Sequence, residues 1–410
     1  MHILIVTNYY PPEIGGSAHL CYELAQSMTA QGHEVTVLTG FPRYNVTELP
    51  RQYRRGLWMN EASNGIRVRR IRIPSLPRDS KIARGLEHFL IGLWLGGLTS
   101  LAGPADVALV DSPPLPLAWM VALAGKLRRL PVLVYLEDLF PHDAVQLGVL
   151  TNPVLIRLFE GMERQMYHLA TAAAVHSPGN KEYVVQHGGQ PERVHVVYLW
   201  VDTDRIRPGE RNNEFASQHG LADRFVVSYA GTMGWAQDMQ TIIASATRLR
   251  DHPEILFLLV GDGVEKEQEM ARSVELGLDN ILWLPMQPWS VYPEILAASD
   301  VSMINLHPNL HTPVVPSKLF SIMAAARPVV ASLPQISDAR HIVAEAGCGI
   351  CVEAGDGEAL AGAILNLHSD RTQAHDMGRR GRVYAEAHFS RQACTSQMET
   401  IFENVAGDNL

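Results

Sequence analysis

The chain has 410 residues, of which 47% are hydrophobic, and a formal net charge of −9. This length is enough for two domains that each bury a full core. The acidic balance argues against a general nucleic-acid-binding protein, which would carry a basic surface. Residues 1–199 have a net charge of +2 and residues 200–410 one of −11. This difference in surface chemistry favours two separate domains.

The first forty residues predict a βαβ unit. Residues 3–6 form an apolar run typical of a buried strand, and a loop rich in proline and glycine follows. Apolar residues at helical spacing predict a helix over residues 18–31, and residues 35–38 predict the next strand. Met1 leads directly into the first strand, so no signal peptide is expected. Further apolar runs predict strands at residues 107–110, 132–135 and 172–175.

A second series of alternating elements begins near residue 225. Strands are predicted at residues 226–231, 255–260, 281–284 and 301–304, and from residue 329. Helices are predicted at residues 239–250 and 264–277, and from Ser317. Residues 197–213 are predicted to link the two series. Parallel strands that alternate with helices predict an α/β chain with two Rossmann-like, doubly wound domains.

The four cysteines do not suggest a metal or redox site. Cys348 and Cys351 form a CxxC motif, but no second pair follows it, and the residues around it are small and apolar. We therefore expect buried thiols. Four cysteines, including Cys21 and Cys394, suit a reducing cytoplasm.

Ser317 and Lys318 stand at the start of a predicted helix, just after Pro316. The start of a helix presents unpaired N–H groups and the positive end of its dipole, which together bind phosphate. Lys318 adds a full positive charge. The alternative is an ordinary capped helix with a solvated lysine.

Glycine-containing loops follow several predicted strands, where α/β proteins place their ligands. Gly15 and Gly16 come after the first strand and open a helix, so the backbone there can approach a ligand closely. Gly231 with Thr232, and Gly261, follow strands of the second series.

Glu137, Asp138, His142 and Asp143 lie together in the loop after residues 132–135. Crowded acids raise each other's pKa, which is common at catalytic sites. The structural alternative is that Asp138 caps the next helix.

In their order and spacing these motifs resemble glycosyltransferase family 4, whose members have the GT-B fold. Residues 138–141, Asp-Leu-Phe-Pro, are similar to a subset that assembles O-antigen and capsule, such as N-acetylfucosaminyl transferases. The resemblance implies two Rossmann-like domains that face a central cleft. The acceptor domain would span residues 1–199 and the donor domain residues 200–389. A C-terminal helix at about 390–410 would cross back onto the first domain.

The resemblance also implies a retaining transfer of a sugar from a nucleotide diphosphate sugar, with UDP as the expected nucleotide, to an acceptor hydroxyl. Asp138 would contact the acceptor, and Glu137 and His142 are further catalytic candidates. The donor-binding candidates are Gly15, Gly16, Gly231, Thr232, Gly261, Met286, Ser317, Lys318 and Ser321.

The chain departs from the family pattern at four positions. Thr232 and Gln237 stand where many members have an arginine and a lysine, and Pro313 and Ser321 stand at the places of two glutamates. Lys318 is then the main cation left for the diphosphate, and Ser321 would hold the donor ribose only weakly. Two alternatives stay open. The loss of the two glutamates allows a non-catalytic GT-B scaffold that binds nucleotides, and the acid/base residues between Glu137 and Asp143 could serve a UDP-sugar epimerase on the same fold.

No metal or other cofactor is expected. Residues 202–204, Asp-Thr-Asp, are similar to a DxD metal motif, but they lie in the predicted linker and match the linker segment of the family. GT-B enzymes generally use backbone dipoles and basic side chains in place of a metal. The expected partners are the nucleotide-sugar donor and a sugar or lipid-linked acceptor.

A peripheral membrane contact is expected within residues 51–104. Residues 51–84 contain ten basic and two acidic residues, and an apolar run follows at 89–95. This run is too short to span a bilayer, which needs about 20 residues, but its composition suits the surface of an anionic membrane. The alternative is a solvated basic face beside a buried helix. The expected location is the cytoplasm, at the inner face of the membrane.

Overall fold

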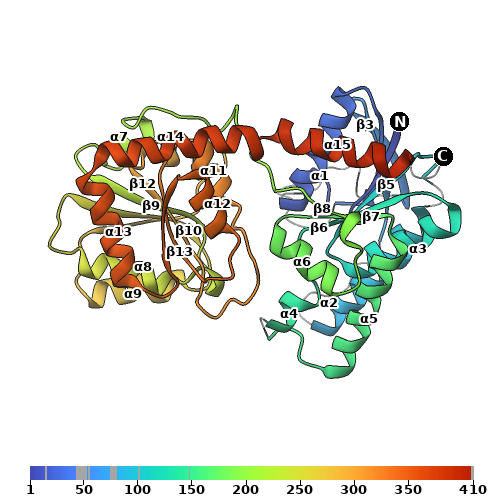
Figure 1. Ribbon diagram of the computed structural model, residues 1–410, viewed down its shortest axis with the longest axis horizontal. Helices are drawn as coiled ribbons and strands as arrows, with labels where there is room; N and C mark the ends of the chain where they lie inside the picture. Colours follow the sequence, from blue (N-terminus) through green and yellow to red (C-terminus); the bar gives the residue numbers. More distant parts are fainter. Residues whose placement is uncertain are drawn as a thin grey trace. The chain divides into compact units, whose positions relative to one another are not determined.

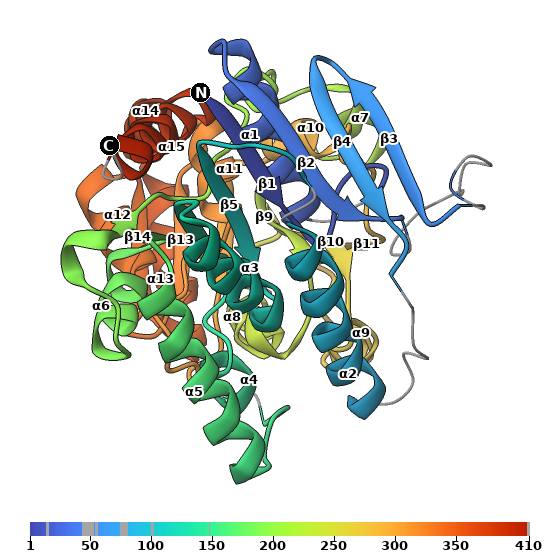
Figure 2. The same ribbon diagram turned by 90° about the vertical axis from the view of Figure 1, so that its right-hand side faces the viewer.

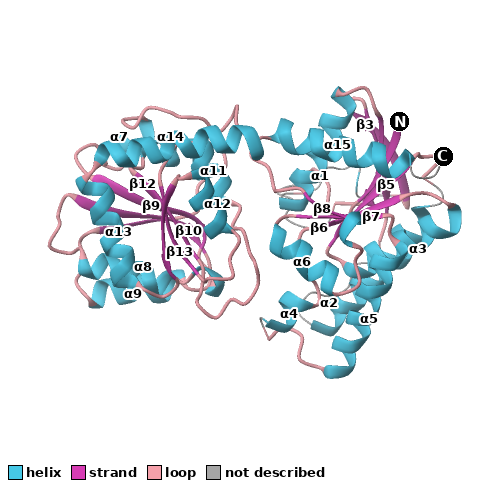
Figure 3. Cartoon of the chain, viewed as in Figure 1, coloured by secondary structure: helices cyan, strands magenta, loops and turns pink. Residues whose placement is uncertain are grey.

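The computed structural model describes residues 1–13, 16–42, 53, 56–73, 81–99, 102–146 and 148–407. The chain folds into two compact units, the first comprising Met1–Tyr198 with Cys394–Leu410 and the second Leu199–Ala393 (Figure 1). In each unit helices surround a sheet, drawn in magenta in Figure 3, whose strands are mostly parallel. The predicted α/β fold class with two Rossmann-like sheets is confirmed.

In the described part of the first unit, eight strands form one sheet in the order β3-β4-β2-β1-β5-β6-β7-β8. Only the pairing of β3 with β4 is antiparallel among these strands. Chain order runs outward in both directions from β1 and β5, so the carboxyl ends of these two strands form a topological switch point. The strands are β1 (His2–Val6), β2 (Glu34–Gly40), β3 (Trp58–Ser63), β4 (Ile66–Ile71), β5 (Val107–Ser112), β6 (Val132–Leu136), β7 (Ala172–Val175) and β8 (Val194–Val196).

Helices cover both faces of this sheet. One face packs against α2 (Lys81–Ile91), the π-helix η2 (Gly92–Gly96), α3 (Leu115–Arg128) and α5 (Pro153–Leu169), and Figure 2 shows α2, α3 and α5 in front of the strands. On the other face, Cys21 of α1 (Gly16–Ala30) and Cys394 of α15 (Arg391–Gly407) both lie near Tyr135 of β6. Glu399 of α15 bonds to His33 at 2.7 Å, which ties this last helix to the first unit.

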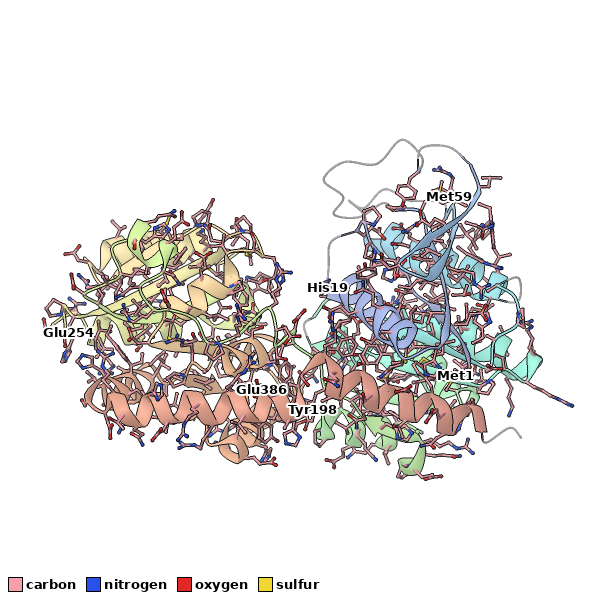
Figure 4. All side chains as sticks on the ribbon, turned by 90° about the horizontal axis from the view of Figure 1, so that it is seen from above. Met1, His19, Met59, Tyr198, Glu254 and Glu386 are labelled. Carbon is pink, nitrogen blue, oxygen red and sulfur yellow. The ribbon has the colours of Figure 1, made fainter. Side chains whose placement is uncertain are left out.

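The segment predicted as a basic membrane surface contains the β3–β4 hairpin, which includes Met59 (Figure 4). Arg70 of β4 is only 1% exposed and bonds to Glu61 at 2.5 Å. Its guanidinium lies 5.9 Å from the ring centre of Tyr10 and 5.1 Å from that of Tyr53. Arg70 therefore stabilises the unit internally and is not one of the basic residues that a membrane surface could contact. The basic residues within 51–52, 54–55 and 74–80 lie outside the described residues.

The second unit has a parallel sheet in the order β11-β10-β9-β12-β13-β14. One face packs against α8 and α13, and the other against α7 and α10. The strands are β9 (Phe225–Thr232), β10 (Ile255–Asp262), β11 (Ile281–Leu284), β12 (Val301–Asn305), β13 (Val329–Leu333) and β14 (Gly349–Glu353). The helices are α7 (Glu214–Gln218), α8 (Met239–Arg248), α9 (Lys266–Glu275), α10 (Tyr292–Ala298), α11 (Lys318–Ala324), α12 (Ala339–Ala346), α13 (Gly357–Ser369) and α14 (Arg371–His388).

The segment predicted as a linker belongs largely to the second unit. Val201 forms a parallel bridge with Ser390, and Arg211 bonds to the carboxylate of Asp300 at 2.9 Å. Asp202 accepts hydrogen bonds from the backbone N–H groups of Asp204 and Arg205. This carboxylate therefore caps a local turn. Across the described ranges, no helix has the length and apolar character needed to cross a bilayer.

Candidate active site

The sheet of the second unit opens between β9 and β12. These strands pair only through Val301 with Val227 and Ser302 with Ser228. By contrast, β9 pairs with β10 as far as Thr232. Because β10 lies on one side and β12 on the other, the opening is the topological switch point of this sheet, where open α/β sheets bind their ligands.

Lys318, the first residue of α11, lies across the end of β9. Its Nζ is 5.1 Å from the ring centre of Tyr229. A Cβ atom on Gly231 would lie 2.3 Å from its Cε and 3.0 Å from its Nζ. Gly231 also has a φ of +140°, which side-chain-bearing residues rarely adopt. A glycine at this position therefore lets the lysine approach the backbone of β9.

Burial lowers the pKa of Lys318 from 10.5 to about 8. A desolvated ammonium interacts strongly with an anion that enters its site, because little water competes for it. This side chain is therefore the clearest anion-binding group that the structure places at the switch point.

The backbone at the start of α11 contributes less than the sequence suggests. The helix has only seven residues, and the Ser317 side chain makes no capping hydrogen bond. The N–H of Leu319 is already bonded to the carbonyl of Pro316 at 2.9 Å. Phosphate binding here would depend mainly on the charge of Lys318.

The other donor-binding candidates of the second unit differ in their exposure to solvent. Thr232 is exposed, and Met286, which follows β11, is 50% exposed. A Cβ on Gly261 would lie 1.9 Å from the carbonyl oxygen of Gly231, so strand packing alone requires glycine there. Ser321 is 7% exposed. Its hydroxyl lies near Tyr292, whose pKa is raised to about 12 by burial. The burial of Ser321 leaves little of its hydroxyl accessible to a ribose.

Two acids lie at the carboxyl ends of β5 and β6 in the first unit. Asp111 is fully buried, and neither of its carboxyl oxygens has a partner at hydrogen-bond geometry among the described residues. Burial and the nearby Glu137 raise its pKa far above the usual range, against a smaller opposing effect of the Thr7 hydroxyl. Burial therefore favours the neutral, protonated form of Asp111.

Glu137 follows β6 and accepts a hydrogen bond from the hydroxyl of Ser17 on α1. Burial raises its pKa to about 7, the Ser17 bond opposes this rise, and the charge of Asp138 adds to it. A carboxyl group with this pKa can exchange a proton near neutral pH. Gly16 is the first residue of α1, one position before Ser17, while Gly15 lies outside the described residues.

Asp138 keeps solvent contact, although neighbouring protein atoms crowd its carboxyl group and raise its pKa by desolvation. Asp143, rather than Asp138, closes the loop, because it accepts a hydrogen bond of 2.9 Å from the N–H of Leu139. His142 begins α4 (His142–Gln146) and its ring centre lies 4.8 Å from that of Tyr183. Burial, followed by the charge of His187, lowers the pKa of His142, so this imidazole is neutral at pH 7.

Sequence reasoning did not single out Asp111 or Asn305, the last residue of β12. Both are buried polar residues at strand ends. The available signal was a polar side chain at the end of a predicted buried strand, in the Val107–Ser112 and Val301–Asn305 segments. Within the described ranges, the structure places no group of three or more His, Cys, Asp or Glu side chains where they could hold a metal ion.

Two Rossmann-like sheets, with a lysine at the switch point of one and acids at the strand ends of the other, are the arrangement expected of a glycosyltransferase of the GT-B class. Residues 15–200 match the glycosyl transferase 4-like domain, and residues 211–384 match the glycosyl transferases group 1 domain. The chain belongs to glycosyltransferase family 4.

Curated relatives and solved structures agree with this assignment. The chain is 24% identical to the Escherichia coli K12 glycosyl transferase WcaI, whose name refers to colanic acid biosynthesis, over 93% of this chain and 96% of WcaI. It is 25% identical to WbjE of Pseudomonas aeruginosa, named as a glycosyltransferase, over 70% of this chain and 73% of WbjE. The fold matches that of HepE from Anabaena in complex with UDP, with a TM-score of 0.72, 17% identity, and coverage of 98% of this chain and 100% of HepE.

Proposed function

We propose that this glycosyltransferase moves a sugar from a UDP-sugar to an acceptor hydroxyl with retention of the anomeric configuration. The donor assignment rests on the half-buried ammonium of Lys318, which lies against Gly231 at the switch point of the second unit and has a pKa lowered by desolvation. A diphosphate is the anionic part of such a donor and needs charge stabilisation as it leaves. HepE, which shares the fold, has been crystallised with UDP and with UDP-glucose.

The proposed reaction breaks the bond between the anomeric carbon and the diphosphate oxygen, and forms a bond from that carbon to the acceptor oxygen on the same face of the sugar. The acceptor proton passes to the leaving phosphate oxygen. Lys318 stabilises the negative charge that develops on the diphosphate. Asp138, the solvent-accessible acid of the first unit, orients the acceptor hydroxyl. Glu137, with a pKa of about 7, is a further group that can exchange a proton.

The test is to supply the protein with UDP-glucose or UDP-N-acetylglucosamine, with and without a lipid-linked sugar acceptor. We expect UDP to be released only when the acceptor is present. We also expect NMR to show that the product has the same anomeric configuration as the donor. Conversion of one UDP-sugar into another without acceptor would identify the epimerase alternative. UDP binding without turnover of any donor would identify the non-catalytic scaffold.

The proposed acceptor is a lipid-linked sugar in the assembly of a bacterial surface polysaccharide, at the cytoplasmic face of the membrane. WcaI is named for colanic acid biosynthesis, and LpsE of Rhizobium meliloti for lipopolysaccharide core biosynthesis. An apolar surface of the first unit supports contact with a bilayer. Leu93 and Trp94 of η2 are 54% and 43% exposed, which suits insertion at the membrane interface.

The membrane proposal predicts that the protein co-sediments with anionic phospholipid vesicles at low salt. Leu93→Ser with Trp94→Ser should reduce the bound fraction several-fold, because it removes apolar surface available for insertion. Leu127→Ser is the matched control, since Leu127 is 77% exposed on α3, outside η2. A parent protein that stays in the supernatant would contradict the membrane contact and favour a soluble acceptor.

UDP binding is predicted to depend on pH through Lys318. The free protein holds this lysine with a pKa of about 8, so its charged form is lost as the pH rises through that value. The dissociation constant for UDP should be nearly constant below pH 7 and increase up to about tenfold per pH unit above pH 8. Calorimetric titrations between pH 6.5 and 9.5 measure this. The Lys318→Ala variant should bind weakly with little pH dependence, and an equally steep profile in that variant would place the titrating group elsewhere.

Activity is predicted to survive a chelator, because the proposed charge stabilisation comes from Lys318 and from backbone N–H groups. Transfer rates measured with and without EDTA should agree within about twofold. A catalytic metal supplies several kcal/mol of transition-state stabilisation, so removing one would slow transfer by far more than twofold. Loss of activity that magnesium or manganese restores would reveal a metal requirement.

A further inference from the structure

Asn305 is a buried amide without hydrogen-bond partners. It is 2% exposed, and neither Oδ1 nor Nδ2 has a partner among the described residues. Other polar side chains in this sheet are satisfied: Ser302 bonds to Ser228 at 2.9 Å, and Ser332 to the carbonyl of Glu353 at 3.3 Å. Because burying an unbonded amide is costly, Asn305 needs a partner that the described residues do not supply.

The register of the sheet places Asn305 beside the expected donor site. Val301 pairs with Val227, and Ser302 pairs with Ser228. If this register is extended by three positions, Asn305 lies opposite Gly231. Pairing between β9 and β12 has ended there, so the two residues border the opening in the sheet. Gly231 is also the residue against which the Lys318 ammonium lies.

Asn305 and Lys318 also share one face of the sheet. Side chains alternate along a strand, so Asn305 lies on the same face of β12 as Val301 and Met303. Those residues pack in one core cluster with Tyr229 of β9, and the Lys318 ammonium lies over the Tyr229 ring. A group bound to Lys318 would therefore have Asn305 as a neighbour across the opening.

We propose that Asn305 binds the sugar of the nucleotide-sugar donor, an inference that rests on the function proposed above. Its Nδ2 donates to one hydroxyl of the sugar and its Oδ1 accepts from another. Phosphate oxygens only accept hydrogen bonds at neutral pH and would leave Oδ1 unpaired, whereas sugar hydroxyls both donate and accept. Asn305 would thus determine which sugar is accepted, because a site that hydrogen-bonds a hydroxyl discriminates strongly against donors without it.

The test is Asn305→Leu, which keeps the approximate volume and removes both polar atoms. Three quantities are measured on the full chain: the melting temperature without ligand, the dissociation constant for UDP, and that for UDP-glucose or UDP-N-acetylglucosamine, whichever binds the parent more tightly. We expect an unchanged or higher melting temperature, because an unbonded buried amide is removed. The UDP constant should stay within twofold, while binding of the UDP-sugar weakens tenfold or more.

The control is Ser302→Ala on the same strand, which removes a hydroxyl that is already bonded within the protein. It should lower the melting temperature and leave the ratio of the two dissociation constants unchanged. If Asn305→Leu does not fold, Asn305→Ala replaces it in the same comparison, with the ratio of constants as the readout.

Two results would overturn the assignment while leaving the proposed function intact. A lower melting temperature with unchanged UDP-sugar binding would mean that a buried water satisfies Asn305 in a structural role. Equal weakening for UDP and the UDP-sugar would mean that Asn305 contacts the diphosphate. A parent protein that binds neither ligand would instead overturn the proposed function, and this assignment with it.

Discussion

Lys318→Ala is expected to weaken UDP binding by about 10- to 100-fold. The change removes a charge-assisted hydrogen bond to the diphosphate, a loss of about 1.5–3 kcal/mol. The folded protein without ligand should not be destabilised. Burial lowers the pKa of Lys318, which means that holding this charge out of water destabilises the folded protein. Weaker binding together with an unchanged or higher melting temperature distinguishes a ligand-binding lysine from a structural one.

Calorimetry with UDP and with uridine separates the two contributions, because uridine lacks the diphosphate. Lys318→Ala should change the UDP constant and leave the uridine constant unaltered. Lys266→Ala is the matched control, since the Nζ of Lys266 donates to the carbonyl oxygens of Gly261 at 2.7 Å and Leu284 at 3.1 Å. That variant should lose stability and keep the preference for UDP over uridine. Equal UDP affinity in the parent and Lys318→Ala would refute the diphosphate assignment.

Most strands of both sheets, β1, β2 and β5–β7 in the first and β9–β13 in the second, could be predicted because their apolar runs are clear. The strand predicted at residues 281–284 is β11 without any change of boundary. The helix predicted at 264–277 is the shorter α9 (Lys266–Glu275), and Gly277 with a φ of +63° stands just beyond it. Such ends depend on local backbone geometry, which hydrophobic periodicity does not report.

The β3–β4 hairpin was not predicted because its sequence does not indicate that one face of β4 is buried. Ile66, Val68 and Arg70 alternate along β4, and all three are buried. In the sequence Arg70 is one of many basic residues and suggests a charged surface. Its partners Glu61, Tyr10 and Tyr53 are brought to it by the fold, and no sequence pattern pairs a particular arginine with them.

In the candidate site, too, the sequence indicated residues but not the contacts that the fold gives them. Residue types and spacing suggested Lys318, Gly231 and Glu137, and their roles remain predictions. Their environments could not be predicted: the lysine lies across the glycine, and Glu137 is half-buried beside Ser17 with a pKa of about 7. Ser321 is only 7% exposed, and this burial weakens the expectation that it holds a ribose.

Gly231→Ala is expected to reproduce most of the binding defect of Lys318→Ala without touching the lysine. The new Cβ would lie 2.3 Å from the Cε of Lys318, so the flexible lysine must move away from β9. The φ of +140° is also strained for alanine, at a cost of about 1–3 kcal/mol of stability. UDP affinity should therefore fall at least about tenfold, near the lower end of the range for loss of a charge-assisted bond.

A double-mutant cycle on UDP affinity tests whether both substitutions act through one ammonium group. If Gly231→Ala weakens binding by displacing Lys318, the substitution should have almost no further effect in a Lys318→Ala background, where no lysine remains to displace. The change in binding free energy of the double mutant would then be smaller than the sum of the two single changes by at least about 1 kcal/mol, as expected for residues in direct contact. Strain at Gly231 is independent of the lysine, so the loss of melting temperature should appear in both backgrounds. Additive losses of UDP affinity would mean that Gly231 contacts the ligand through its own backbone, and that the close approach of Lys318 is not what requires glycine there.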